Sequence, residues 1–192
     1  MRSSAAEASV CAHIAQSVIP AMGVGNPMNS DEKSDCDSRR RAMFAGAAAL
    51  GDPRRASPNV LLSSAELTIF AATWTPQINL MPHNHLMWAS IGIHAGREDN
   101  IFRERTSSGI EAYCVGALFE KDTAMLPGDV LHSVTNPLLR FTGGIHVYGG
   151  DFFGTARSRW NPETLNEEPS DGEVIRGIFQ RENERLGLDT IS

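Results

Sequence analysis

Helical periodicity at the two ends of the chain encloses a central region with the pattern of short strands. Apolar residues recur at helical spacing over residues 4–19 and predict a first helix there, and a second helix is predicted over Asp31–Leu50. From Asp171 onward the spacing becomes helical again. The apolar face of this last helix is predicted to hold Val174, Ile175, Ile178 and Phe179.

After Pro58 the apolar runs become short and rich in β-forming residues, and Gly, Pro, Asn and Asp separate them. The predicted strands are 59–62, 66–74, 86–94, 110–119, 123–126, 130–134 and 142–148. Short strands with turns at this spacing are typical of a β-sandwich or barrel. The fold class predicted is therefore an all-β core with flanking helices. Its parts are a helical segment over 1–57, a β-barrel over 58–156, and a loop and helix over 157–192.

Composition and charge exclude several classes of partner. The 192 residues are 41% hydrophobic and 21% charged, which is ordinary for a soluble globular protein. The 17 basic residues are outnumbered by 23 acidic ones, so we expect no nucleic-acid or anionic membrane partner. No apolar run has the length that a bilayer requires, and the N-terminus leads into no stretch suited to a signal peptide.

The three cysteines are Cys11, Cys36 and Cys114. They are widely spaced and odd in number, which fits neither a disulfide framework nor a C-x-x-C metal site. From this pattern we expect a reducing, cytoplasmic location.

Five of the six histidines lie between His83 and His146, and two of them, His83 and His85, are separated by one residue. On a β-strand, residues i and i+2 project from the same face, so both imidazoles can reach one point in space. Imidazole is the commonest protein ligand for divalent transition metals. His132, from a later strand, would complete a set of three and leave coordination positions open. The sequence therefore predicts a catalytic type of metal site.

A histidine in a β-rich core is often only a hydrogen-bonded structural residue. We interpret His13, on a predicted helix, and His94, at a strand end, in this way. The H-x-H pair is different because two imidazoles on one face seldom lie together without a shared ligand. With His132 added, metal binding is the favoured interpretation.

These residues resemble the cupin superfamily, whose fold is the double-stranded β-helix, or jelly roll. His83 and His85 match the H-x-H of its first motif, and Pro127, His132 and Asn136 keep the spacing of its second. The resemblance implies a jelly-roll barrel with metal ligands His83, His85 and His132. Cupins often dimerise, so a homodimer is also expected by analogy of fold.

The glutamate of the first cupin motif is missing, because Ala89 and Ser90 stand where it is expected. Glu98 lies beyond the turn at Gly96 and is not expected to replace it. Three neutral imidazoles leave a divalent ion with its full double charge, which favours anionic, electron-rich substrates such as a thiolate or an enolate.

All-histidine ligation looks like that of the thiol dioxygenases, of which cysteine dioxygenase is the best known. That family uses ferrous iron and O₂ to convert a thiol to a sulfinic acid, and carries Ser-x-His-x-Tyr on a late strand. His146 and Tyr148 match this pattern, and Gly144 replaces the serine. The resemblance implies that His146 orients Tyr148, whose phenol hydrogen-bonds to bound oxygen or substrate. A tyrosine and a histidine that only pack a barrel wall would give the same pattern.

The chain departs from the thiol dioxygenases where they bind the substrate carboxylate, because no arginine aligns with theirs and Ser90 stands near their crosslinking cysteine. Cysteine is therefore not the expected substrate. Another thiol, or a substrate whose charge Arg97, Arg103 or Arg140 binds, stays open. Trp88 is a further candidate, as part of an apolar wall around the substrate.

The overall resemblance, over about Asp52–Phe153, is to a bacterial group described only as predicted metal-dependent proteins of the double-stranded β-helix class. Its signatures include Pro82–Trp88 and Gly96–Phe102. The second of these blocks is expected to form a charged turn near the barrel mouth. The function expected is an Fe(II)-dependent thiol dioxygenase. A diketone-type carbon–carbon-cleaving dioxygenase and a non-enzymatic metal or small-molecule binding cupin are the alternatives.

Overall fold

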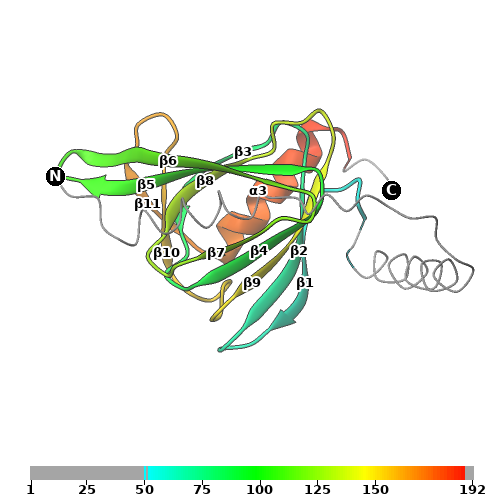
Figure 1. Cartoon of the computed structure of the whole chain (residues 1–192), viewed down its shortest axis with the longest axis horizontal. Helices are drawn as coiled ribbons and strands as arrows, with labels where there is room; N and C mark the ends of the chain where they lie inside the picture. Colours follow the sequence, from blue (N-terminus) through cyan, green and yellow to red (C-terminus); the bar gives the residue numbers. More distant parts are fainter. Residues whose placement is uncertain (1–49, 51, 189–192) are drawn as a thin grey trace, which may run out of the picture.

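The computed structural model describes residues 50 and 52–188, which form two antiparallel β-sheets and one helix (Figure 1). The five-stranded sheet has the order β1 (Ser57–Ser63), β2 (Thr68–Trp74), β9 (Thr142–Tyr148), β4 (Ala89–Ala95) and β7 (Thr123–Leu126). The six-stranded sheet has the order β11 (Glu167–Ser170), β10 (Arg157–Trp160), β3 (Asn79–Asn84), β8 (Leu131–Thr135), β5 (Arg97–Thr106) and β6 (Gly109–Phe119).

The chain passes from one sheet to the other at almost every step between β2 and β10. Strands β2, β4, β7 and β9 lie in the five-stranded sheet, whereas β3, β5, β6, β8 and β10 lie in the six-stranded sheet, and only the β5–β6 hairpin stays within one. This winding is that of a double-stranded β-helix, so the jelly-roll prediction is confirmed. The helices predicted over residues 4–19 and Asp31–Leu50 lie outside the described residues.

Helix α3 (Gly172–Arg185) packs against the core between the sheets, as the helical pattern beyond Asp171 predicts. Asp171 caps it, because its carboxylate accepts hydrogen bonds from the backbone N–H groups of Glu173 and Val174, both at 3.0 Å. Its apolar face is buried, and Phe179 stacks on Trp74 with 5.2 Å between ring centroids. The helix therefore forms part of the wall around the interior of the barrel.

Four strands were not predicted from the sequence: β3, β5, β10 and β11. The expectation that Gly96–Phe102 forms a turn at the barrel mouth is wrong, because only Gly96 is a turn residue and the rest begins β5. The charged residues of this block suggested a turn, but in the structure they lie on a strand whose side chains point alternately inward and outward. Glu98, Asn100 and Phe102 are buried on one face, while their neighbours are partly exposed. Likewise, β10 and β11 occupy a stretch for which a loop was expected.

Cys114 lies on β6, and the other two cysteines, Cys11 and Cys36, lie outside the described residues, so the expected reducing location stays a prediction. No helix among residues 50 and 52–188 is long and apolar enough to cross a membrane.

Candidate metal centre

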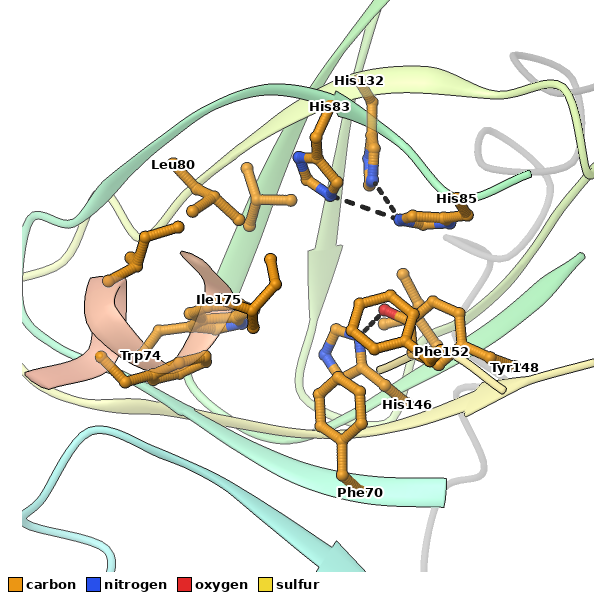
Figure 2. Close-up of a pocket in the computed structure, with 14 residues that line it drawn as sticks. Phe70, Trp74, Leu80, His83, His85, His132, His146, Tyr148, Phe152 and Ile175 are labelled. Atoms are coloured by element: carbon orange, nitrogen blue, oxygen red, sulfur yellow. Dashed lines mark hydrogen bonds between the residues drawn. The ribbon is translucent and has the colours of Figure 1, made fainter. Parts of the chain in front are cut away.

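Three imidazoles converge inside the barrel, as the H-x-H pattern and His132 predict (Figure 2). Strands β3 and β8 are neighbours, and their register places His83 directly opposite His132. His85 follows the end of β3 and lies on the same face as His83. The Nε2 atom of His85 is 3.3 Å from that of His83 and 3.1 Å from that of His132. All three side chains are buried.

These separations fit a single bound divalent transition metal. Metal–nitrogen bonds of about 2.1 Å that enclose angles of roughly 90–109° place the nitrogens about 3.0–3.4 Å apart. The imidazoles are also held in the neutral form that a metal requires. Burial lowers the pKa of His83 to about 4 and lowers the pKa values of His85 and His132 well below the ordinary value.

Hydrogen bonds at the far side of two rings fix which nitrogen faces the centre. The Nδ1–H of His83 donates to the carbonyl oxygen of Met81 at 3.1 Å, and the Nδ1–H of His132 donates to Oδ1 of Asn100 at 2.6 Å. Each Nε2 is then left with a free lone pair that points to the others. The Nδ1 of His85 is buried and has no hydrogen-bond partner among the described residues.

A buried network of hydrogen bonds connects His132, through Asn100, to Glu98 and Trp74. The amide of Asn100 donates to Oε1 of Glu98 at 3.1 Å, and the indole N–H of Trp74 donates to Oε2 of the same carboxylate at 2.9 Å. Glu98 is fully buried, and this burial raises its pKa to about 7 although both hydrogen bonds oppose the shift. It is not one of the converging ligands, so its contact with the centre runs through Asn100.

His146 and Tyr148 face the three imidazoles from β9, in the opposite sheet (Figure 2). The Nδ1 of His146 and the hydroxyl of Tyr148 are 3.3 Å apart, and the rings of Tyr148 and His85 meet edge to face at 5.0 Å. Burial raises the pKa of Tyr148 and lowers that of His146 to about 3. The phenol is therefore protonated and the imidazole neutral at physiological pH, so Tyr148 can donate a hydrogen bond.

A cavity of about 30 Å³ separates the two groups. Its polar lining consists of the three converging histidines with His146 and Tyr148. Its apolar lining consists of Phe70, Trp74, Leu80, Ile91, Val134, Phe152, Ile175, Ile178 and Phe179. A volume of this size holds one or two water molecules, and apolar walls give such water few partners. The site can exclude bulk water from the face of the centre.

The four residues predicted from the sequence to bind substrate, Arg97, Arg103, Arg140 and Trp88, do not line this cavity. Arg97 makes a two-bond ion pair with Asp99 at 2.6 and 2.9 Å. Arg103 hydrogen-bonds to Ser133. Trp88 is 43% exposed and packs its ring against Gly149. Their role in substrate binding stays a prediction that this geometry does not support.

Three residues near the centre were missed by sequence analysis. Glu98 was not expected to replace the missing ligand and is not one of the converging residues, but its hydrogen bond to Asn100, which lay in the expected turn, was not foreseen. Arg157 lay in a region predicted as loop, but on β10 it is 5% exposed with its guanidinium 3.8 Å from the ring centroid of Phe152. Its charge adds a smaller contribution to the lowered pKa of His83. Residues 97–100 are all polar, so no alternation of apolar and polar residues in the sequence marks Glu98 and Asn100 as the two that point inward.

The fold and the site together define a double-stranded β-helix protein with a three-histidine group able to hold a metal. No family model and no curated protein matches the sequence.

Solved structures similar to this chain include three from microorganisms. One is a protein from Bacillus halodurans, at 14% identity over 69% of this chain and 86% of that one, with a TM-score of 0.45. Another is an uncharacterised conserved protein with a double-stranded β-helix domain from Klebsiella pneumoniae, at 13% identity over 53% of this chain and 77% of that one, with a TM-score of 0.43. The third is an RmlC-like cupin family protein from Methanocaldococcus jannaschii, at 12% identity over 51% of this chain and 83% of that one, with a TM-score of 0.42. Because these sequence identities and TM-scores are low, the assignment of the fold rests on the order of the strands in the two sheets.

Proposed function

We propose that this protein is a non-haem Fe(II)-dependent dioxygenase that converts a small thiol to a sulfinic acid. The observation that supports the proposal is the convergence of three neutral Nε2 atoms on one side of a mostly apolar cavity, with a protonated tyrosine on the other. Fe(II) held by His83, His85 and His132 would stabilise the thiolate over the thiol and react with O₂.

The side chains of this chain supply the rest of the chemistry. None of the three converging residues brings a negative charge, so the site attracts an anionic sulfur more strongly than a site with a carboxylate ligand. The apolar walls suit the hydrocarbon part of a small thiol and give water few hydrogen-bond partners, so a thiol can displace it. Tyr148 points its hydroxyl into the same space, where it can hydrogen-bond to substrate or O₂.

The proposal is tested by oxygen uptake of anaerobically purified, Fe(II)-loaded protein with a panel of small thiols and diketones. We expect uptake with a thiol, loss of uptake in His132→Ala, and normal uptake in His94→Ala. His94 is the matched control because it is an exposed histidine on β4 outside the cavity. Uptake with diketones alone would move the assignment to carbon–carbon cleavage. Metal binding without uptake for any compound would favour a binding protein.

The tyrosine is tested separately with Tyr148→Phe. This change removes one hydroxyl and keeps the ring that packs on Phe152 at 4.1 Å between centroids. We expect turnover with thiol to fall by about 10²-fold or more, with the metal content unchanged, because a positioned proton donor typically contributes 10²–10⁴-fold. Unchanged turnover would remove Tyr148 from the mechanism.

A further inference from the structure

Glu98 is a carboxylate that the ligand set and the tyrosine leave unexplained. It is 0% exposed and is the second residue of β5, where its two oxygens accept one hydrogen bond each, from Asn100 and Trp74. Burying a carboxylate is costly unless it is paired with a cation or can take up a proton. No Lys or Arg side chain within residues 50 and 52–188 forms an ion pair with it. The structure therefore retains a group suited to accept a proton.

His146 is the group that such a proton would come from. Its Nε2 is buried, has no hydrogen-bond partner among the described residues, and lies 3.7 Å from Oε2 of Glu98. The other nitrogen of the same ring, Nδ1, lies 3.3 Å from the hydroxyl of Tyr148. The imidazole thus stands between a buried carboxylate and a phenol that borders the cavity.

Gly144 explains why the carboxylate can occupy this place. A Cβ at position 144 would lie 3.3 Å from Nε2 of His146, so a serine there would direct its side chain at the atom that now faces Glu98. Thiol dioxygenases carry a serine at the matching position. In this chain the glycine leaves that side of the imidazole to the carboxylate.

The titratable and hydrogen-bonding groups that face Glu98 come from three strands. His146 and Tyr148 face it from β9, Asp99 is its neighbour on β5, and Trp74 donates to it from β2. Asp99 adds a negative charge that makes proton uptake easier, whereas the two hydrogen-bond donors favour the ionised form. Burial outweighs these donors, and the resulting pKa of about 7 leaves Glu98 able to hold or release a proton under ordinary conditions.

We infer that Glu98 accepts the proton that the substrate thiol loses on binding, through Tyr148 and His146. In this transfer the S–H bond breaks and its proton goes to the phenol oxygen, the phenol proton goes to Nδ1, and the Nε2 proton goes to Glu98. Tyr148 and His146 end with the number of protons they began with, and the ring has exchanged tautomers. The net change is one thiol and one carboxylate to one thiolate and one carboxylic acid. This step rests on the thiol substrate proposed above.

The proton on Glu98 is measured first, in metal-free protein without substrate. Infrared difference spectra across a pH titration should show the C=O band of a buried carboxylic acid that disappears as the pH rises through about 7. The band should be absent in Glu98→Gln, which keeps the shape of the side chain, and present in Glu163→Gln, which changes an exposed glutamate. A Glu98 band that is missing throughout this range would overturn the inference whatever the substrate is.

The transfer is measured next, with Zn(II)-loaded protein, which binds a thiolate without oxygen chemistry. Titration calorimetry with 2-mercaptoethanol in buffers of different ionisation enthalpy counts the protons released per thiol bound. We expect Glu98→Gln and His146→Gln to release up to about one proton more than wild type and Glu163→Gln. Equal release from all four proteins would overturn the inference. If 2-mercaptoethanol does not bind, both the proposed thiol function and the transfer step are overturned. The infrared result then shows only whether Glu98 itself takes up a proton.

Discussion

Replacing Asn100 with alanine should loosen the metal centre without touching a ligand. The amide of Asn100 joins two buried groups, because its Oδ1 accepts from His132 at 2.6 Å and its Nδ2 donates to Glu98 at 3.1 Å. The change leaves one buried N–H and one buried carboxylate oxygen without this partner. At about 1–3 kcal/mol for each orphaned group, the free energy of unfolding should fall by about 2–6 kcal/mol.

Metal affinity should fall in the same variant, because His132 would no longer be held with its Nε2 lone pair toward the centre. Loss of a residue that orients a metal ligand typically costs 10–100-fold in affinity. That range corresponds to about 1.4–2.7 kcal/mol of binding free energy. Competition with a chromophoric chelator measures the affinity, and urea unfolding of the metal-free protein measures the stability.

The matched control is Asn79→Ala. Asn79 is an exposed asparagine on β3 whose Oδ1 accepts a 3.3 Å hydrogen bond from Thr135 on the neighbouring strand, so this change also removes one cross-strand side-chain contact. It should alter metal affinity by less than about twofold, because surface substitutions usually change stability by under 0.5 kcal/mol. Wild-type metal affinity in Asn100→Ala, with or without lower stability, would refute the argument that Asn100 orients His132.

Two further predictions concern stability. Metal-free protein should lose stability as the pH falls from about 6.5 to the folded-state pKa values of about 4 for His83 and about 3 for His146, because the unfolded chain binds protons at these histidines first. Glu98 should oppose this loss between about pH 7 and 4.5, because its folded-state pKa is raised and the folded protein takes up its proton first. Thermal melts across this range check it, and a flat profile would contradict the burial of the imidazoles. Gly96→Ala should lower stability by at least about 1–3 kcal/mol, because Gly96 has φ +85° and an added Cβ would lie 3.0 Å from the Cα of Thr142. An unchanged melting temperature would refute that strain.

The convergence of the three histidines could be predicted from the sequence because most of its geometry is local. His83 and His85 are two residues apart on an extended segment, so strand alternation alone brings them to one face. Only His132 required knowledge of the fold, and the cupin spacing from Pro127 supplied it. The register of β3 with β8 then places it opposite His83.

Glu98 and Asn100 could not be assigned from the sequence because their burial depends on partners far along the chain. Trp74 is 24 residues from Glu98 and His132 is 32 residues from Asn100, and each supplies the hydrogen bond that makes an inward polar side chain tolerable. Without those partners the run of charged residues after Gly96 is typical of a turn. Similarly, β10 is four residues long and contains two arginines, so its pattern alone does not predict a strand.

The position of Glu98 matters because the chain lacks a carboxylate among the three residues that could hold a metal. A carboxylate bound to the metal would lower the charge of the centre by one unit and would be unable to take up a proton. In this chain the three ligands are neutral, and the nearest buried carboxylate among the described residues is one amide away from His132 and 3.7 Å from His146. Under the function proposed above, a metal held by these imidazoles would keep its full charge for an anionic sulfur, while the carboxylate would stay free to bind a proton. The proposal therefore assigns substrate attraction to the metal and proton uptake to Glu98, whereas a glutamate bound to the metal could not take up a proton and would also weaken the attraction.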